Sequence, residues 1–171
     1  DSQRLGAEGE GWNVSLTTLM NERFAVGVAP APDFDEIFEL VRNTEIEDGP
    51  ALDNALIRDR IADWYVRQQG LKNAHFRTMT ALSRGGTPGP ESSINKVVSA
   101  TKYQDISLFG MDLQEIAGAM TDPENSAMGG LFQNGTLSSP GYRIAGGTDE
   151  ILRNIIAERI LCLPQEVRPD K

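Results

Sequence analysis

Glu22 is the residue of this sequence whose neighbours most favour a chemical role. It lies in the stretch Leu16–Val28, LTTLMNERFAVGV, where the only formal charges are Glu22 and Arg23. The residues one helical turn away are all small or apolar, namely Thr18, Leu19, Ala25 and Val26. A carboxylate on such a dry surface has a raised pKa, which suits a general base. The alternative is a salt-bridged helix charge at a domain edge, which the pattern alone favours because helical carboxylates far outnumber catalytic ones.

Gly146-Gly147-Thr148 is the second candidate. Two glycines allow the backbone to approach a ligand closely, and the start of a helix presents N–H groups suited to phosphate. Thr148 can cap that helix, whereas Asp149 and Glu150 complement the helix dipole but repel an anion. Three residues are too few to be specific, and the pattern alone favours a capped helix without a ligand.

His75, the only histidine, lies with Gln68 and Thr78 on one face of a long predicted helix. This face follows steps of three and four through Ile57, Ile61, Trp64, Gln68, Leu71, His75, Thr78 and Leu82. The three polar residues indicate either a hydrated seam between subunits or domains, which the pattern favours, or a face toward a bound polar ligand. We assign His75 no catalytic role, because no ligand-type partner stands three or four residues away.

Composition excludes several classes of function. Sixteen Lys and Arg against twenty-five Asp and Glu give a net charge of -9, so nucleic acid and anionic membranes are poor partners. A phosphate-bearing ligand would need local arginines or backbone amides. The single cysteine, Cys162, fits a reducing compartment, and we expect a cytoplasmic protein without a usual Cys/His zinc site. Within this sequence no apolar run is long enough to span a bilayer, and no basic stretch is followed by an apolar signal-type segment.

Apolar periodicity predicts an all-α fold that resembles a four-helix bundle. Helices are expected over about 12–28, 34–42, 51–82 and 91–120, with a last helix after Thr148 that runs to about Leu161. Asp33 is the expected N-cap of the helix over 34–42. Residues 121–147 are expected to be irregular, with one helical turn near Leu131. No segment alternates with the period of a strand.

The same periodicity predicts which residues face the core. The first helix repeats apolar residues every four positions, at Trp12, Leu16, Met20, Phe24 and Val28. The helix over 91–120 is expected to be buried on several sides through Ile94, Val97, Val98, Ile106, Leu108, Phe109, Met111, Leu113 and Ile116. The last helix is expected to bury Ile151, Leu152, Ile155, Ile156 and Ile160.

Residues 146–164, GGTDEILRNIIAERILCLP, resemble the C-terminal signature of the acyl-CoA dehydrogenase family, which typically reads Gly-Thr-Ser-Glu-Ile-Gln-Arg-Asn-Ile-Ile-Ala-Glu-Arg. Two further stretches agree with the family in order and separation: GEGWNVSLTTLMNERFAVG at the front and GTPGPESSINKVVSA in the middle. The resemblance covers essentially the whole chain. Its style is similar to the actinobacterial branch that acts on long-chain or steroid side-chain thioesters.

The resemblance implies a domain organisation. Residues 1–11 correspond to the loop that leads in from a β-domain, 12–164 to the C-terminal helical domain, and 165–171 to a tail. The N-terminal helical domain and the middle β-domain of the family have no counterpart in this sequence. We expect them on the same or another polypeptide, and we expect this piece alone to be inactive.

The resemblance also implies a reaction, the α,β-dehydrogenation of an acyl-CoA thioester. A glutamate removes the α-proton while the β-hydride passes to the N5 atom of FAD. Many members place this base immediately before the Gly-Thr of the signature, but that position is Gly146 here. A second branch places it on the first helix of the C-terminal domain before an arginine, which matches Glu22-Arg23. Glu22 is therefore the predicted base.

Other site residues follow from the same alignment. Gly147, Thr148 and Glu150 match positions at the FAD pyrophosphate and ribose, with Gly147 allowing close approach. Gln114 and Gly118 match the loop that holds the adenine of a neighbouring subunit's FAD.

Substrate contacts are implied for three residues of the first helix. Arg23 would support the base and the substrate pocket, and Leu19 and Met20 would line the acyl end. The family's Arg-x-Gln-Phe-Gly motif, which binds the diphosphate of the neighbour's FAD, is missing, and residues 45–52 stand in its place.

The implied assembly is a homo- or hetero-tetramer that acts in fatty acid or steroid degradation, with an electron-transfer flavoprotein as a candidate partner. Two alternatives stay open. The chain could be a non-catalytic partner subunit of a heteromeric dehydrogenase, which Gly146 and the missing motif favour, or a helical oligomerisation module without a ligand.

Overall fold

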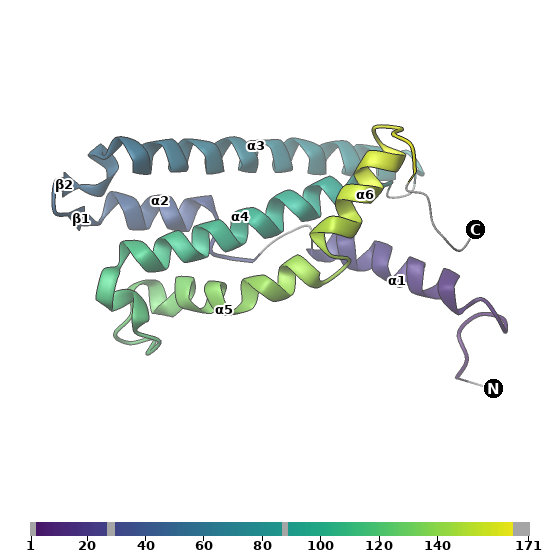
Figure 1. Cartoon of the computed structure of the whole chain (residues 1–171), viewed down its shortest axis with the longest axis horizontal. Helices are drawn as coiled ribbons and strands as arrows, with labels where there is room; N and C mark the ends of the chain where they lie inside the picture. Colours follow the sequence, from purple (N-terminus) through teal and green to yellow (C-terminus); the bar gives the residue numbers. More distant parts are fainter. Residues whose placement is uncertain (1–2, 27–29, 87–88, 166–171) are drawn as a thin grey trace.

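The computed structural model describes residues 3–26, 30–86 and 89–165, and the side chains of 23–26 lie outside this description. Within these ranges the chain forms a helical domain (Figure 1). Its α-helices are α1 Gly11–Val26, α2 Phe34–Arg42, α3 Ala55–Ser83, α4 Ser92–Leu113, α5 Leu131–Ile144 and α6 Asp149–Arg159. The all-α class predicted from the sequence is confirmed.

Short elements connect the helices. β1 Glu45–Ile46 pairs antiparallel with β2 Gly49–Pro50, so that Glu45 lies opposite Pro50. The 3-10 helix η1 Ala51–Asp53 leads into α3. Two further 3-10 helices, η2 Glu115–Ala119 and η3 Ala127–Gly130, join α4 to α5. Among the described helices none is long and apolar enough to cross a membrane.

Helix α4 is the centre of the fold. It packs against α5, α3, α6, α1 and α2, and Figure 1 shows it running between α3 and α5. Close packing against α5 depends on glycine at two crossing points. A Cβ atom on Gly110 of α4 would overlap the Phe132 ring, and one on Gly135 of α5 would overlap the Ser107 hydroxyl. Small residues therefore set the short distance between these helices.

The apolar core lies in the half of the bundle that contains α2. Its buried members are Ile37, Leu40, Val41, Ala51, Ile61, Trp64, Ile106 and Phe132. The Trp64 ring packs edge-on against Phe109, with 5.2 Å between their centroids. Each fully buried aliphatic or aromatic side chain contributes about 1.5–3 kcal/mol, so this cluster dominates the packing energy of the domain.

Helix α2 follows the sequence prediction in both limits. The Asp33 side chain accepts a hydrogen bond from the Phe34 N–H at 2.6 Å, and Glu36 accepts one from the Asp33 N–H at 2.8 Å. The Glu36 bond and a hydrogen bond from the Glu36 N–H to the Asp33 side chain form the capping box that starts the helix. The α3 face predicted from Ile57 to Leu82 is also confirmed, since all eight of its residues are buried or half-buried.

Helix α5 contradicts the prediction that residues 121–147 are irregular. Pro140 lies inside the helix and Gly135 and Gly141 flank it, and all three residues ordinarily weaken helices. Packing against α4 outweighs them, because Gly135 fits against Ser107 and Phe132 lies fully buried below Gly110. The segment over 91–120 is likewise not one helix, since α4 ends at Leu113 and a 3-10 helix follows.

The predicted inward faces are confirmed in part, since residues such as Val97, Ile106 and Leu152 are buried or half-buried, but other predicted members are exposed. Helix α4 is buried on several sides as expected, but largely through small and polar residues: Ser93, Lys96, Ser99, Ala100, Lys102, Tyr103, Ile106, Ser107 and Gly110. Ile116 is 91% exposed, and Ile94, Leu108 and Ile151 are exposed as well. On α1, Trp12 is 71% exposed and Met20 is exposed, whereas Leu16 is half-buried. Phe24 and Val28 lie outside the described side chains.

Candidate functional site

The turn that precedes α6 contains two glycines in a left-handed conformation, followed by the residue that caps the helix. Gly146 and Gly147 have φ angles of 68° and 112°, a region that residues with a Cβ seldom adopt. Thr148 then takes the extended conformation of an N-cap, and its hydroxyl accepts from the Ile151 N–H at 3.5 Å. The local sequence therefore builds the turn that was predicted to approach a ligand.

A buried lysine of α4 donates hydrogen bonds to this turn and to the end of α5. Lys96 is 0% exposed, and its Nζ donates to the carbonyl oxygen of Arg143 at 2.7 Å and to that of Gly147 at 2.8 Å. The same Nζ lies 3.8 Å from Oδ1 of Asp149. One side chain thus joins α4, the end of α5 and the start of α6.

Asp149 does not act on the turn as the sequence suggested. Its side chain is nearly buried, and Arg143 donates to Oδ2 through Nε at 2.8 Å and through Nη2 at 2.5 Å. Arg143 also donates through Nη1 to Gln104 Oε1 at 2.8 Å. Two cations, Arg143 and Lys96, therefore offset one carboxylate, and the repulsion of an anion that we expected from Asp149 is cancelled.

Glu150 keeps its negative charge on the exposed side of the same turn. Its own backbone N–H and the Thr148 hydroxyl donate hydrogen bonds to the carboxylate and lower its pKa below the ordinary 4.5, with smaller contributions from Arg153 and Arg143. An ionised carboxylate in this place is a hydrogen-bond acceptor for hydroxyl groups, such as those of a ribose.

A cavity of about 280 Å³ opens at this turn. Its walls come from α4, α5 and the start of α6: Gln104, Pro140, Arg143, Ile144, Thr148, Asp149 and Glu150. The cavity thus brings together the N-terminus of α6, the Thr148 hydroxyl and the Glu150 carboxylate, while the Arg143 guanidinium in its wall already donates to Asp149 and Gln104. The helix N-terminus and the Thr148 hydroxyl can donate to a phosphate, and the Glu150 carboxylate can accept from hydroxyl groups; the resemblance implied an FAD pyrophosphate and ribose for Gly147, Thr148 and Glu150.

Glu22 lies on α1, which packs against α4 at the same end of the bundle as α6 (Figure 1). The carboxylate of Glu22 is exposed, Leu19 is half-buried and Met20 is exposed. The described part of this domain therefore does not supply the dry surroundings that the neighbouring residues predicted for Glu22. The reason is that α1 projects from the bundle and presents much of its surface to solvent (Figure 1). Arg23 is among the side chains outside the described residues.

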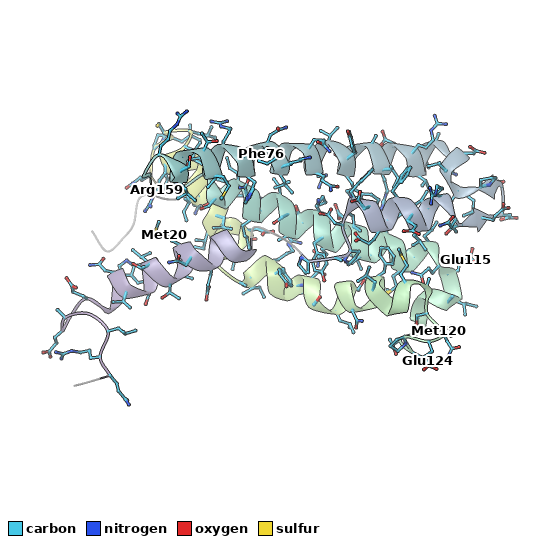
Figure 2. The ribbon with its side chains drawn as sticks, turned by 180° about the vertical axis from the view of Figure 1, so that it is seen from behind. Met20, Phe76, Glu115, Met120, Glu124 and Arg159 are labelled. Carbon is cyan, nitrogen blue, oxygen red and sulfur yellow. The ribbon has the colours of Figure 1, made fainter. Side chains whose placement is uncertain are left out.

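Gln114 and Gly118 lie at the other end of the molecule. Figure 2 shows Met20 and Arg159 at one end and Glu115, which directly follows Gln114, at the opposite end. Gln114 and Gly118 therefore lie apart from the predicted site residues of α1.

Gln114 lines a cavity of about 720 Å³ together with the segment that replaces the family's arginine motif. Its lining residues are Glu39, Leu40, Asn43, Thr44, Glu45, Ile46, Glu47, Leu113, Gln114, Glu115, Ala117, Ala127 and Met128. Four carboxylates and no lysine or arginine stand in this lining. The two segments that the resemblance assigned to one ligand thus meet in space, but their charge does not fit a diphosphate.

Gly118 has a packing reason of its own. A Cβ atom there would overlap the Met111 carbonyl oxygen, so the close return of the chain onto the end of α4 requires glycine. The side-chain amide of Gln114 donates to the Gly110 carbonyl at 2.7 Å, while its Oε1 is buried without a hydrogen-bond partner.

Three residues that surround the turn were not predicted as part of the site: Lys96 and Gln104 on α4, and Arg143 on α5. A signal for Lys96 is present in the sequence, since it is the only charge in the stretch 92–100, SSINKVVSA. Its partners at Arg143 and Gly147 stand 47 and 51 residues away, so no local pattern connects them.

Comparison with known proteins identifies the fold and the family. Residues 9–161 match the model of the acyl-CoA dehydrogenase C-terminal domain. The acyl-CoA dehydrogenase IpdE1 of Mycolicibacterium smegmatis is 31% identical over 168 residues, which cover 96% of this chain and 40% of that relative. This chain thus spans less than half the length of the relative.

Solved structures agree with this match. The ChsE4–ChsE5 complex from Mycobacterium tuberculosis superimposes with a TM-score of 0.73 at 26% identity, covering 96% of this chain and 43% of that one. Butyryl-CoA dehydrogenase from Megasphaera elsdenii gives a TM-score of 0.72 at 17% identity, covering 92% and 40%, and so shares the fold. The chain belongs to the acyl-CoA dehydrogenase family and carries its C-terminal helical domain.

Proposed function

We propose that this chain is part of an FAD-dependent acyl-CoA dehydrogenase that introduces an α,β double bond into an acyl-CoA thioester, with Glu22 as the base that removes the α-proton. The observation that carries the proposal is the family match over residues 9–161, combined with a carboxylate at Glu22 and none at Gly146. An active member needs one carboxylate at the α-carbon, and Glu22 stands at a position from which the family supplies it.

This domain would form only part of the active site in which Glu22 acts. The carboxylate is exposed in this domain. Proton abstraction from carbon, by contrast, needs a base in a site from which water is excluded, with a pKa near neutral pH. The chain spans 40% of the length of its relative, so the surface that covers α1 would come from the remaining domains or from a partner chain. Leu19 and Met20, three and two residues before Glu22 on the same helix, would then line the acyl end, and Arg23 would support the site.

The turn before α6 would hold the cofactor. FAD, when bound, supplies the N5 acceptor for the β-hydride. Gly147 permits close approach, Thr148 offers its hydroxyl and the helix N-terminus to the pyrophosphate, and Glu150 accepts from ribose hydroxyls. The cavity that Thr148 and Glu150 both line and the offset charge of Asp149 support this assignment. The proposed assembly is a cytoplasmic homo- or hetero-tetramer whose electrons pass to an electron-transfer flavoprotein.

A second candidate function is a supporting subunit in a heteromeric dehydrogenase. It is favoured by the acidic cavity at Gln114, which does not suit the diphosphate of a neighbour's FAD. It also agrees with a similar solved structure, ChsE4–ChsE5, being a complex of two different chains. In that case the chain would carry Glu22 but would not itself convert substrate. Gln114 and Gly118 would contact at most the uncharged adenine of the FAD.

Glu22→Gln in the full-length protein, purified with any partner chain, tests the proposal. Its FAD content should equal that of the wild type, but an acyl-CoA substrate should no longer bleach the flavin. Glu10→Gln, an exposed carboxylate one residue before α1, is the matched control and should bleach normally. Normal bleaching in Glu22→Gln would reject the assignment of the base. One FAD per copy of the chain would contradict a purely supporting role.

A further inference from the structure

Burying the charge of Lys96 costs free energy, and the groups around the side chain compensate for this cost. A lysine charge out of water is costly unless hydrogen-bond acceptors and opposite charge replace the solvent. Lys96 has both, since two carbonyl oxygens lie at 2.7 and 2.8 Å and the Asp149 carboxylate at 3.8 Å. Its main direct partners are thus backbone atoms of the glycine turn and of the helix before it.

The position of these carbonyls favours a cation. Arg143 is the penultimate residue of α5, where unpaired carbonyls carry the negative end of the helix dipole. Gly147 lies immediately before the N-cap of α6. Lys96 therefore fixes the end of one helix relative to the start of the next.

The bond to Gly147 also orients the turn. In a trans peptide the C=O and the following N–H point in opposite directions. Because the Gly147 carbonyl points toward Lys96, the N–H of Thr148 points away from it. Two consecutive glycines at positive φ allow many alternative backbone conformations, and the Lys96 bond selects one of them.

We propose that Lys96 is a positioning residue for the flavin-binding turn, which sets the direction of the Thr148 N–H and the start of α6 by holding the carbonyls of Arg143 and Gly147. The proposal rests on the proposed function, in which this turn binds the FAD pyrophosphate. Lys96 also contributes the second positive charge that, with Arg143, offsets Asp149. In this role Lys96 would act through the turn and not by contact with substrate or cofactor.

Lys102 provides a matched control in the same helix. It is also a nearly buried lysine, at 2% exposure, but its ion pair is with Asp33 at the start of α2 rather than with the turn. Lys96→Met and Lys102→Met each remove one buried charge from α4. They should both lower thermal stability, yet only the first should affect the turn.

The experiment measures FAD affinity by fluorescence titration of the full-length apoprotein, purified with any partner chain, together with the circular dichroism of the bound flavin. Lys96→Met should weaken FAD binding about tenfold or more, because the binding groups are no longer preorganised. It should also change the flavin dichroism. Lys102→Met should bind FAD within about twofold of wild type, and Lys96→Arg should recover most of the affinity because it keeps the charge and the donors. Equal effects of the two methionine variants, or an unchanged affinity in Lys96→Met, would overturn the proposal.

Asp149→Asn gives a second test that does not depend on Lys96→Met folding. It removes the carboxylate but leaves both carbonyl bonds of Lys96, so FAD affinity should stay within about threefold of wild type or become tighter. A tenfold loss would overturn the proposal, because the carboxylate rather than the lysine would then set the turn. Thr148→Ala separates this inference from the proposed function. If it leaves FAD binding unchanged, or the wild type binds no FAD, the proposed function fails; if it weakens binding and Lys96→Met does not, only the role of Lys96 fails.

Discussion

Lys102 of α4 and Asp33, the N-cap residue of α2, form an ion pair whose two members are buried to very different extents. The Lys102 side chain is 2% exposed and that of Asp33 is 36% exposed. Asp33 also accepts from the Phe34 N–H, so the same carboxylate starts α2 and compensates a buried charge of α4. This pair ties α2 to the central helix.

The difference in burial predicts unequal effects of breaking the pair. Asp33→Asn keeps a good N-cap but leaves the Lys102 charge uncompensated inside the protein, which should cost about 3 kcal/mol of unfolding free energy. Lys102→Met leaves a partly hydrated Asp33 that retains its cap bond, and should cost about 1–2 kcal/mol. Urea denaturation of the two variants measures both values. A larger loss for Lys102→Met than for Asp33→Asn would contradict the assigned burial.

Helices that are determined by residues close in sequence were predicted more accurately than helices that depend on packing against distant segments. Helix α2 was predicted over its observed range because proline and the Asp33 cap act within a few residues of its start. Helix α5 was missed because Pro140 and its flanking glycines oppose a helix locally, while the packing that outweighs them comes from α4. A pattern over neighbouring residues does not reveal a contact with a residue that is distant in sequence.

The candidate site divides in the same way. The turn at Gly147 and Thr148 was found from a short motif, whereas the residue that holds it, Lys96, was not. The inward-facing positions of α4 were predicted only in part: Ile106 is buried, but Leu108 is exposed, and the helix also buries small and polar residues such as Ser107, which apolar periodicity does not mark. Close helix packing selected those residues, and hydrophobicity alone does not reveal it.

Two glycines of α5 should respond to alanine in opposite directions. A Cβ atom on Gly135 would overlap the Ser107 hydroxyl and come within 3.0 Å of Pro32, so Gly135→Ala should destabilise the protein by about 1–3 kcal/mol. Nothing lies within 4 Å of the Cβ position of Gly141. Gly141→Ala should therefore stabilise by up to about 1 kcal/mol through higher helix propensity. Thermal unfolding measures both, and equal signs would contradict the packing described for α4 and α5.

Glu150 should make a pH-dependent contribution to stability. Because hydrogen bonds from its own N–H and from Thr148 lower its pKa below 4.5 in the folded state, the unfolded chain binds more protons between the two values. The contribution is therefore complete above 4.5 and is lost as the pH falls through the folded pKa. The free energy difference between wild type and Glu150→Gln should be constant near neutrality and shrink as the solution is acidified below 4.5. A difference that does not change with pH would contradict these hydrogen bonds.

Thr148 and Gln114 should differ in their importance for flavin, because Thr148 stands at a helix N-terminus beside a guanidinium, whereas the cavity at Gln114 is lined by four carboxylates and no lysine or arginine. Thr148→Ala removes the cap of α6 and a hydroxyl of the proposed site. In the full-length protein it should lower FAD affinity about tenfold, and it should cost about 1 kcal/mol of stability. Thr148→Ser keeps the hydroxyl and should stay close to wild type in both measurements.

Gln114→Ala provides the comparison at the opposite end of the molecule. Glu39, Glu45, Glu47 and Glu115 surround Gln114, and no cation in the cavity lining could balance a diphosphate. FAD content measured on the purified complex should therefore be unchanged in Gln114→Ala and reduced in Thr148→Ala. If Gln114→Ala lost flavin instead, a neighbour's FAD would have to bind at the acidic cavity, and cations from another chain would then be needed to balance these carboxylates.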